Sequence, residues 1–145
     1  MPTTIEANKD VVRAYLDAFN DQDREALADV VAEGVVEHGP HEEIRGIDEF
    51  LDNPWENLQA FPDYEGTTDV IIGECDFVCF RYTISGTHEV DYYGINATGN
   101  FVEWTGIAMY RIGDDEIAEI WLEEDRLGLL EQLGIDLDAH RRRVD

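Results

Sequence analysis

The residues with the clearest chemical potential lie near the end of the chain, where an aromatic segment is followed by a carboxylate. Trp121 precedes Asp125 by four residues at the end of a strand-like run. A carboxylate held just beyond an apolar strand can serve as a general base in an enclosed cavity, because it needs only to reach the proton. Apolar neighbours such as Trp121 raise the pKa of a carboxyl group and make it more basic. Asp125 is therefore the first candidate for a catalytic acid or base.

Two acidic neighbours, Glu123 and Glu124, compete with Asp125 for this assignment. We prefer Asp125 because entry into the following helix should turn it inward, whereas its neighbours have the pattern of solvated surface. Glu119 is a further acid in the same predicted strand, two residues before Trp121, so both side chains point to one side. If Trp121 faces a cavity, Glu119 faces it too; otherwise Glu119 lies on an exposed sheet edge.

Two histidines are the other polar candidates. His38 precedes a Gly-Pro break, and His88 ends a strand-like segment. Either ring could form a hydrogen bond with a substrate carbonyl, or bond to the backbone as a half-exposed strand residue. His38 and His41 are three residues apart, but the break between them removes the helical geometry that would bring both onto one metal ion. Ser85 is the only serine and has no nucleophile elbow around it. We therefore expect neither a metal site nor a serine hydrolase.

The charge of the chain excludes two classes of partner. Acidic residues number 34 against 10 basic ones, which gives a formal net charge of −24. Such a field repels nucleic acid and anionic lipid, so we expect neither as a partner. No segment has the length and apolarity of a membrane span, and the first residues lack the pattern of a secretory signal. We interpret the protein as cytoplasmic, from a high-salt cytosol in which surface repulsion is screened.

The apolar periodicity predicts helices first and strands afterwards. Helical spacing covers residues 5–20, a second helix capped by Asp21 or Asp23 ends at Gly34, and a third begins near Ile47 and can restart at Pro54. Between them, residues 35–38 form a short strand. Period-two alternation then predicts strands near 67–73, 76–87, 100–112 and 116–123, with a tight turn at 113–115 and a terminal helix over 126–133. This is an α+β pattern with an antiparallel meander. We expect one domain over residues 1–145, with a core of about 5–134 and a tail of 135–145.

A curved sheet wrapped around helices leaves a cone that small molecules can enter, and binding cavities are mostly apolar. Several aromatic residues could line it, although some must be ordinary core. The candidates are Tyr15, Phe19, Trp55, Phe61, Trp104, Tyr110 and Trp121.

Several short motifs, in this order, resemble the SnoaL-like polyketide cyclases of the nuclear transport factor 2-like superfamily. They are Tyr15-Leu16-Asp17-Ala18-Phe19-Asn20, Glu37-His38-Gly39-Pro40, Phe61-Pro62-Asp63, Gly86-Thr87-His88, Ala97-Thr98-Gly99, Glu119-Ile120-Trp121 with Asp125, and Leu129-Leu130-Glu131-Gln132-Leu133-Gly134.

The resemblance implies a cystatin-like cone and ring closure by intramolecular aldol condensation. An aspartate, matched here by Asp125, would serve as general acid/base without a metal or organic cofactor. His38 and His88 match histidines near the pocket mouth. The chain departs from the family pattern at Val90, often glycine, and its bulky Tyr92-Tyr93 predicts a narrower mouth.

Three hypotheses follow from the sequence. The first is an enzyme acting on a small carbonyl compound, with Asp125 as proton shuttle and His38 and Tyr15 as hydrogen-bond partners. The second is a carrier or sensor that uses the same cavity only to bind a ligand. The third is a scaffold domain used for pairing. Convex sheet faces of this fold type commonly pair, so we expect a homodimer.

We predict that the fold weakens below about 0.5 M salt, because the Debye length grows as salt is removed and the net charge of −24 is less screened. Thermal unfolding in KCl from about 0.1 M to about 3 M should show a rising melting temperature. A melting temperature that does not change over this range would contradict the high-salt interpretation.

Overall fold

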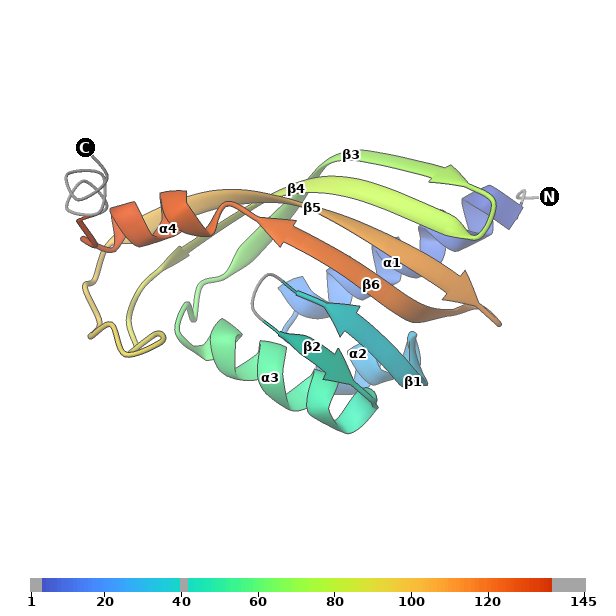
Figure 1. The fold of residues 1–145 in the computed structure, drawn as a ribbon, viewed down its shortest axis with the longest axis horizontal. Helices are drawn as coiled ribbons and strands as arrows, with labels where there is room; N and C mark the ends of the chain where they lie inside the picture. Colours follow the sequence, from blue (N-terminus) through green and yellow to red (C-terminus); the bar gives the residue numbers. More distant parts are fainter. Residues whose placement is uncertain (1–3, 40–41, 137–145) are drawn as a thin grey trace, which may run out of the picture.

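A computed structural model of the chain shows a curved six-stranded sheet with helices against its concave side and at its ends (Figure 1). It describes residues 4–39 and 42–136, and for 53–58 only the backbone. The elements are α1 (Thr4–Asn20), α2 (Arg24–Asp29), β1 (Val31–His38), β2 (Glu43–Arg45), α3 (Ile47–Gln59), β3 (Glu65–Glu74), β4 (Phe77–Thr87), β5 (Phe101–Gly113), β6 (Glu116–Glu124) and α4 (Arg126–Gln132). The α+β prediction is confirmed.

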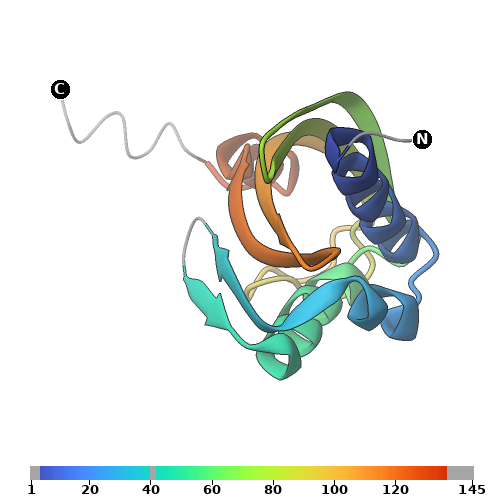
Figure 2. The ribbon, with the colours of Figure 1, turned by 90° about the vertical axis from the view of Figure 1, so that its right-hand side faces the viewer.

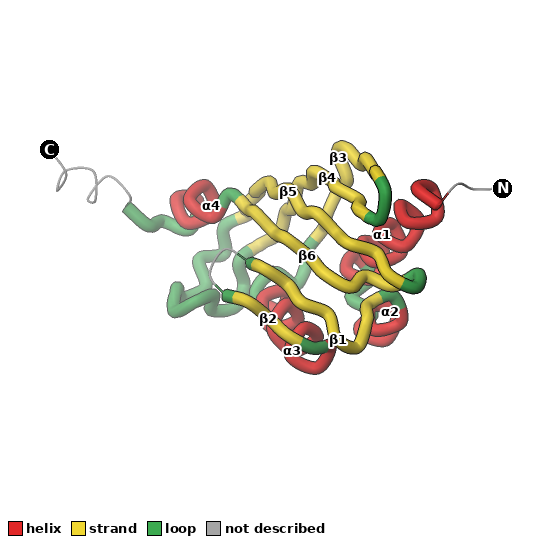
Figure 3. Tube along the Cα trace, turned by 45° about the vertical axis from the view of Figure 1, so that its right-hand side comes forward, coloured by secondary structure: helices red, strands yellow, loops and turns green. Residues whose placement is uncertain are grey.

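The strands lie in the order β2-β1-β6-β5-β4-β3, which Figure 3 shows as a continuous sheet. All neighbouring pairs are antiparallel except β1 and β6, which run parallel. The expectation of a wholly antiparallel sheet is therefore wrong at this pair. A parallel pair needs a long crossover connection, and here most of the chain separates its two strands.

Helix α1 covers the concave side of the sheet (Figure 2). Its buried face includes Val12, Tyr15 and Ala18, which recur every third residue and therefore share one side of the helix. The chain turns after α1, and Asp23 caps α2 by accepting a hydrogen bond from the amide of Ala26 at 3.0 Å. Of the two aspartates predicted as possible caps, Asp23 is therefore the one that caps this helix.

Three local expectations differ from the structure. Gly34 lies inside β1 and does not end the second helix, which stops before Val31. Helix α3 continues through Pro54 instead of restarting there. The strand β2 was missed, because Glu43–Arg45 is too short to show an alternation.

The hairpin between β5 and β6 forms where the sequence predicts it. Asp114 and Asp115 have φ values of 52° and 62°, which is the left-handed pair that a two-residue type I′ turn requires. Close to this turn, β6 carries a β-bulge: Ile112 faces Ile117, whereas Arg111 faces Glu119, so Ala118 is the extra residue. Regular alternation starting at Ile117 would predict one face of the sheet for each later side chain of β6. Because of the bulge, these side chains point to the opposite face.

Candidate functional site

A cavity of about 170 Å³ lies between the concave face of the sheet and α1. An engineered cavity of roughly 150 Å³ holds benzene, so this one can enclose about one six-membered ring. Its lining is mostly aromatic and aliphatic, with three glutamates and one arginine. The lining residues are Tyr15, Leu16, Phe19, Asn20, Glu37, Gly39, Glu42, Ile44, Phe61, Tyr64, Gly66, Thr67, Thr68, Phe80, Tyr82, Ile84, Tyr92, Tyr93, Trp104, Tyr110, Ile120, Leu122, Glu124 and Arg126.

Packed aromatic rings give the cavity its walls. The ring of Tyr15 meets those of Phe19 and Tyr110 edge-on, at centroid distances of 4.9 Å and 5.2 Å. Phe61 packs against Trp104 at 5.2 Å. Burial raises the pKa of both Tyr15 and Tyr110 well above the usual tyrosine value, so both stay neutral and able to donate hydrogen bonds.

Glu37 brings an ionisable group into this apolar space. Its neighbours in β1 alternate, so that Val35 and Glu37 point inward while Val36 and His38 point outward. Only 8% of Glu37 is exposed. Desolvation, and then the charge of Glu124, raise the pKa of Glu37 to about 7, while Arg126 partly opposes this change. Glu37 can therefore gain or lose a proton near neutral pH.

Glu124 is held in place by two neighbours. The hydroxyl of Tyr82 donates a hydrogen bond to its Oε1 at 2.8 Å, and Nε of Arg126 lies 3.2 Å from its Oε2. Tyr82 reaches Glu124 from β4 by lying across Gly106 of β5, where a Cβ atom would overlap the tyrosine ring. Arg126 in turn donates to the hydroxyl of Tyr92 at 2.8 Å. The cavity therefore contains a fixed carboxylate–guanidinium pair beside Glu37.

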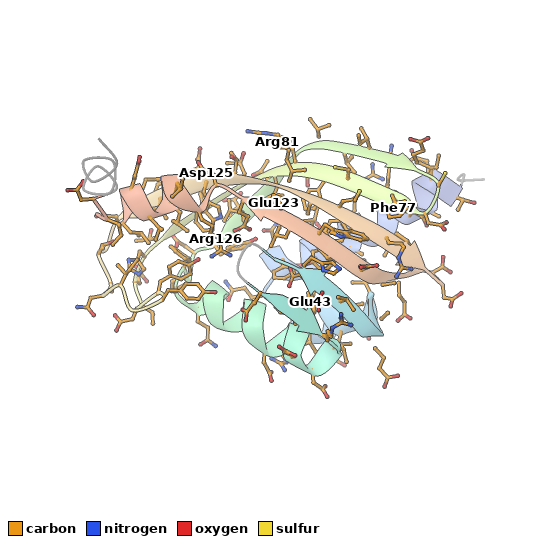
Figure 4. The ribbon with its side chains drawn as sticks, viewed as in Figure 1. Glu43, Phe77, Arg81, Glu123, Asp125 and Arg126 are labelled. Atoms are coloured by element: carbon orange, nitrogen blue, oxygen red, sulfur yellow. The ribbon has the colours of Figure 1, made fainter. Side chains whose placement is uncertain are left out.

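Asp125 does not line the cavity. It is exposed, and its Oδ1 accepts a hydrogen bond from the amide of Gly128 at 2.9 Å as the N-cap of α4. In Figure 4, Asp125 and Arg126 lie on different sides of the start of α4, with Arg126 on the side of α3. The expectation that helix entry turns Asp125 inward is wrong, because capping fixes its carboxylate on the backbone. The inward acid is Glu124, its neighbour.

Trp121, Glu119 and His38 also lie outside the cavity, on the opposite face of the sheet. The bulge at Ala118 turns Ile120, Leu122 and Glu124 inward, and the residues between them outward. Here the rings of His38 and Trp121 stack at 5.4 Å. Nε2 of His38 lies 2.7 Å from Oε2 of Glu119, and this hydrogen bond lowers the pKa of Glu119. The expectation that Trp121 and Glu119 face the cavity is wrong.

The remaining predicted residues fall into three groups. Tyr15, Trp104 and Tyr110 line the cavity, and their binding of a substrate stays a prediction. His88 is fully buried but does not line the cavity. Its Nδ1 accepts a hydrogen bond from the amide of Thr98 at 3.2 Å. The side chain of Trp55 lies outside the described part of the structure.

Sequence reasoning missed Glu37, Glu124 and Arg126 as cavity residues. A signal existed for Glu37, because it continues the inward alternation of a strand that begins with apolar residues. No such signal existed for Glu124, whose direction depends on the bulge at Ala118. Within residues 4–39 and 42–136, no cluster of three or more histidine, cysteine or acidic side chains could hold a metal ion. None of the described helices is long and apolar enough to span a membrane.

The sequence profile of the SnoaL-like polyketide cyclases matches residues 9–133. The chain belongs to this family. No curated protein shows significant sequence similarity to it.

Solved structures share the fold over most of their length. IdmH from Streptomyces antibioticus, a proposed polyketide cyclase, is 30% identical and superposes with a TM-score of 0.77 over 88% of this chain and 99% of its own. AclR from Streptomyces galilaeus, a proposed hydroxylase, is 24% identical with a TM-score of 0.82, over 90% of this chain and 87% of its own. A SnoaL-like protein from Jannaschia sp. CCS1 is 16% identical with a TM-score of 0.87, over 94% and 97% of the two chains. The two less similar proteins bear on the fold alone.

The raised pKa of Glu37 predicts a loss of stability with rising pH. The folded state keeps a proton that the unfolded chain releases near pH 4.5, so this stabilisation is complete below that pH and is lost as the pH rises through about 7. Compared with Glu37→Gln, the wild type should lose up to about 3 kcal/mol of unfolding free energy between about pH 5 and about pH 8.

Urea unfolding at both pH values measures this difference. Glu33→Gln is the matched control, because Glu33 lies in the same strand as Glu37 but is exposed. A difference between wild type and Glu37→Gln that stays constant with pH would show that Glu37 does not titrate in this range.

Proposed function

We propose that the protein catalyses proton transfer next to a carbonyl group of a small molecule bound in the cavity, with Glu37 as the general acid/base. The observation that carries this proposal is the position of Glu37, a buried carboxyl group with a pKa of about 7 in an aromatic cavity. A general base works best when its pKa lies near the working pH, because the basic form is populated and still strongly basic. The match to the cyclase family and the likeness to IdmH support a reaction of this kind.

The chemistry balances with the residues present. The carboxylate of Glu37 takes a proton from the carbon next to the carbonyl, and the electron pair of that C–H bond moves onto the carbonyl oxygen as an enolate. Return of the proton to another position completes an isomerisation. Attack of the enolate carbon on a second carbonyl of the same molecule forms a carbon–carbon bond and closes a ring, after which Glu37 returns the proton to the new alkoxide.

Glu37 occupies the role that Asp125 was expected to fill. The cavity encloses about one ring, so a polycyclic substrate would extend beyond it, past exposed lining residues such as Thr67 and Tyr93. Asp125 is the competing assignment, and the two can be separated by mutation. Asparagine remains a good N-cap, so Asp125→Asn should keep α4 intact.

Deuterium exchange into 2-tetralone, an enolisable ketone whose C1 is benzylic, tests this proposal by NMR in D₂O. We expect wild type to accelerate exchange at C1, and Glu37→Gln to lower the rate by about 10²-fold or more, because a positioned base contributes about 10²–10⁴-fold. Asp125→Asn should keep most of the rate. Loss of exchange in Asp125→Asn with retention in Glu37→Gln would reassign the base to Asp125. Binding of 2-tetralone without any acceleration in wild type would instead support a carrier.

We further propose that the convex face of the sheet pairs two copies of the chain. Ile72, Cys79, Met109 and Trp121 lie opposite one another across four strands, and Ile72 is 60% exposed. The adjacent row includes Arg81, Ile107 and Glu123 in direct register, with Ile107 between the other two. A two-fold axis through Ile107 would set Arg81 of each copy against Glu123 of the other.

Sedimentation equilibrium in molar KCl should therefore give the mass of two chains. Ile107→Glu places a charge at the centre of this face and should yield a monomer, because a buried unpaired charge strongly opposes association. Val90→Glu is the control, since Val90 is equally exposed but lies in the loop before β5. A monomeric wild type, or an Ile107→Glu protein that stays dimeric, would refute pairing through this face.

A further inference from the structure

Two hydrogen-bond donors in the cavity wall have no acceptor. Within the described part of the chain, three buried side-chain nitrogens make no hydrogen bond. They are Nε2 of His88, which does not line the cavity, and Nε1 of Trp104 and Nε of Arg126, which do. Trp104 is 7% exposed. Nε of Arg126 does lie 3.2 Å from Oε2 of Glu124, but its N–H is not directed at that oxygen. Buried donors are nearly always paired, so two unpaired ones at a cavity indicate a ligand atom that accepts from them.

The two donors belong to the wall of the same cavity, near the end of β6. The ladder between β5 and β6 pairs Gly106 with Glu124, and it continues through a hydrogen bond of 2.9 Å from the amide of Asp125 to the carbonyl of Thr105. Arg126 follows Asp125 as the first residue of α4, and Trp104 precedes Thr105 in β5. Both residues line the cavity. The cavity has a volume of about 170 Å³ and encloses about one six-membered ring, so one ligand of that size can face both side chains.

The charge around these two donors favours a neutral ligand oxygen over a negatively charged one. Three carboxyl groups line the cavity, from Glu37, Glu42 and Glu124, against the single guanidinium of Arg126. The positive charge of Arg126 is already largely balanced by Glu124 at 3.2 Å. A ligand carboxylate would therefore meet net repulsion. A neutral carbonyl oxygen meets two N–H donors without this cost, and it carries negative charge only while a reaction proceeds.

We infer that Trp104 and Arg126 form a subsite for the oxygen of a neutral, ring-attached ketone or aldehyde, and that the protein selects such carbonyl compounds over carboxylates. This inference rests on the proposed function, because the same oxygen would carry the enolate charge when Glu37 removes the neighbouring proton. Binding of the carbonyl group itself does not require that reaction. The two claims can therefore be tested separately.

Three one-ring probes of similar shape measure what the carbonyl oxygen contributes to binding. Acetophenone carries the carbonyl, α-methylstyrene replaces the oxygen by a CH₂ group, and benzoate replaces the ketone by a carboxylate. The chain has three tryptophans, so ¹H–¹⁵N spectra contain at most three indole signals, and Trp104→Phe assigns the relevant one. Titrations give both the affinity and the shift of that signal.

We expect acetophenone to bind about tenfold more tightly than α-methylstyrene, and benzoate to bind more weakly than acetophenone. Acetophenone should also move the Trp104 indole proton downfield, which α-methylstyrene should not do. Trp104→Phe removes one donor and should reduce the tenfold preference to about twofold. Trp121→Phe is the matched control, since Trp121 lies on the opposite face, and it should keep the preference.

Equal affinities for acetophenone and α-methylstyrene in wild type would overturn the subsite, as would tighter binding of benzoate. The indole shift is measured on the unaltered protein, so the test holds even if Trp104→Phe does not fold. Two measurements on wild type, the acetophenone preference and deuterium exchange, separate the two proposals. If wild type shows the acetophenone preference but no deuterium exchange, the subsite is sustained and proton transfer by Glu37 is refuted. If wild type shows exchange but no preference, proton transfer is sustained and the subsite is refuted.

Discussion

The carboxyl group of Glu37 lies inside an apolar cavity beside the carboxylate of Glu124, and the other polar groups of the site are arranged around this unfavourable burial. Placing two acids together in low dielectric keeps one of them protonated near neutral pH, unless cations or donors compensate. Arg126 and Tyr82 compensate Glu124, which leaves Glu37 as the group whose pKa rises to about 7. A single constraint thus yields one fixed carboxylate and one that exchanges its proton.

The architecture supplies this constraint through neighbours that are distant in the sequence. Glu37 comes from β1, Glu124 from the end of β6 and Arg126 from the first turn of α4, and the parallel pairing of β1 with β6 brings the first two together. Gly106 leaves room for Tyr82 to cross β5 and reach Glu124. Most of the cavity lining is aromatic or aliphatic, so water has few partners there, and the acids act mainly on each other and on a ligand.

The candidate site could be predicted only in part. Tyr15, Trp104 and Tyr110 line the cavity because each lies on the buried face of a long, regular element, where periodicity is a reliable signal. Trp121 and Glu119 were misplaced by one extra residue, Ala118, which reverses the two faces of β6 and leaves no mark in the alternation. Asp125 was misplaced because its carboxylate caps the helix that was expected to turn it inward.

Composition and periodicity alone determined the α+β class, the helices at the start, the long strands and the tight turn at 113–115, because these depend on local propensity and on apolar spacing. The parallel pairing of β1, the direction of side chains after the bulge and the meeting of Glu37, Glu124 and Arg126 depended on the tertiary structure. The pKa of a buried acid reflects desolvation and nearby charge, and both are properties of the folded surroundings and not of the residue.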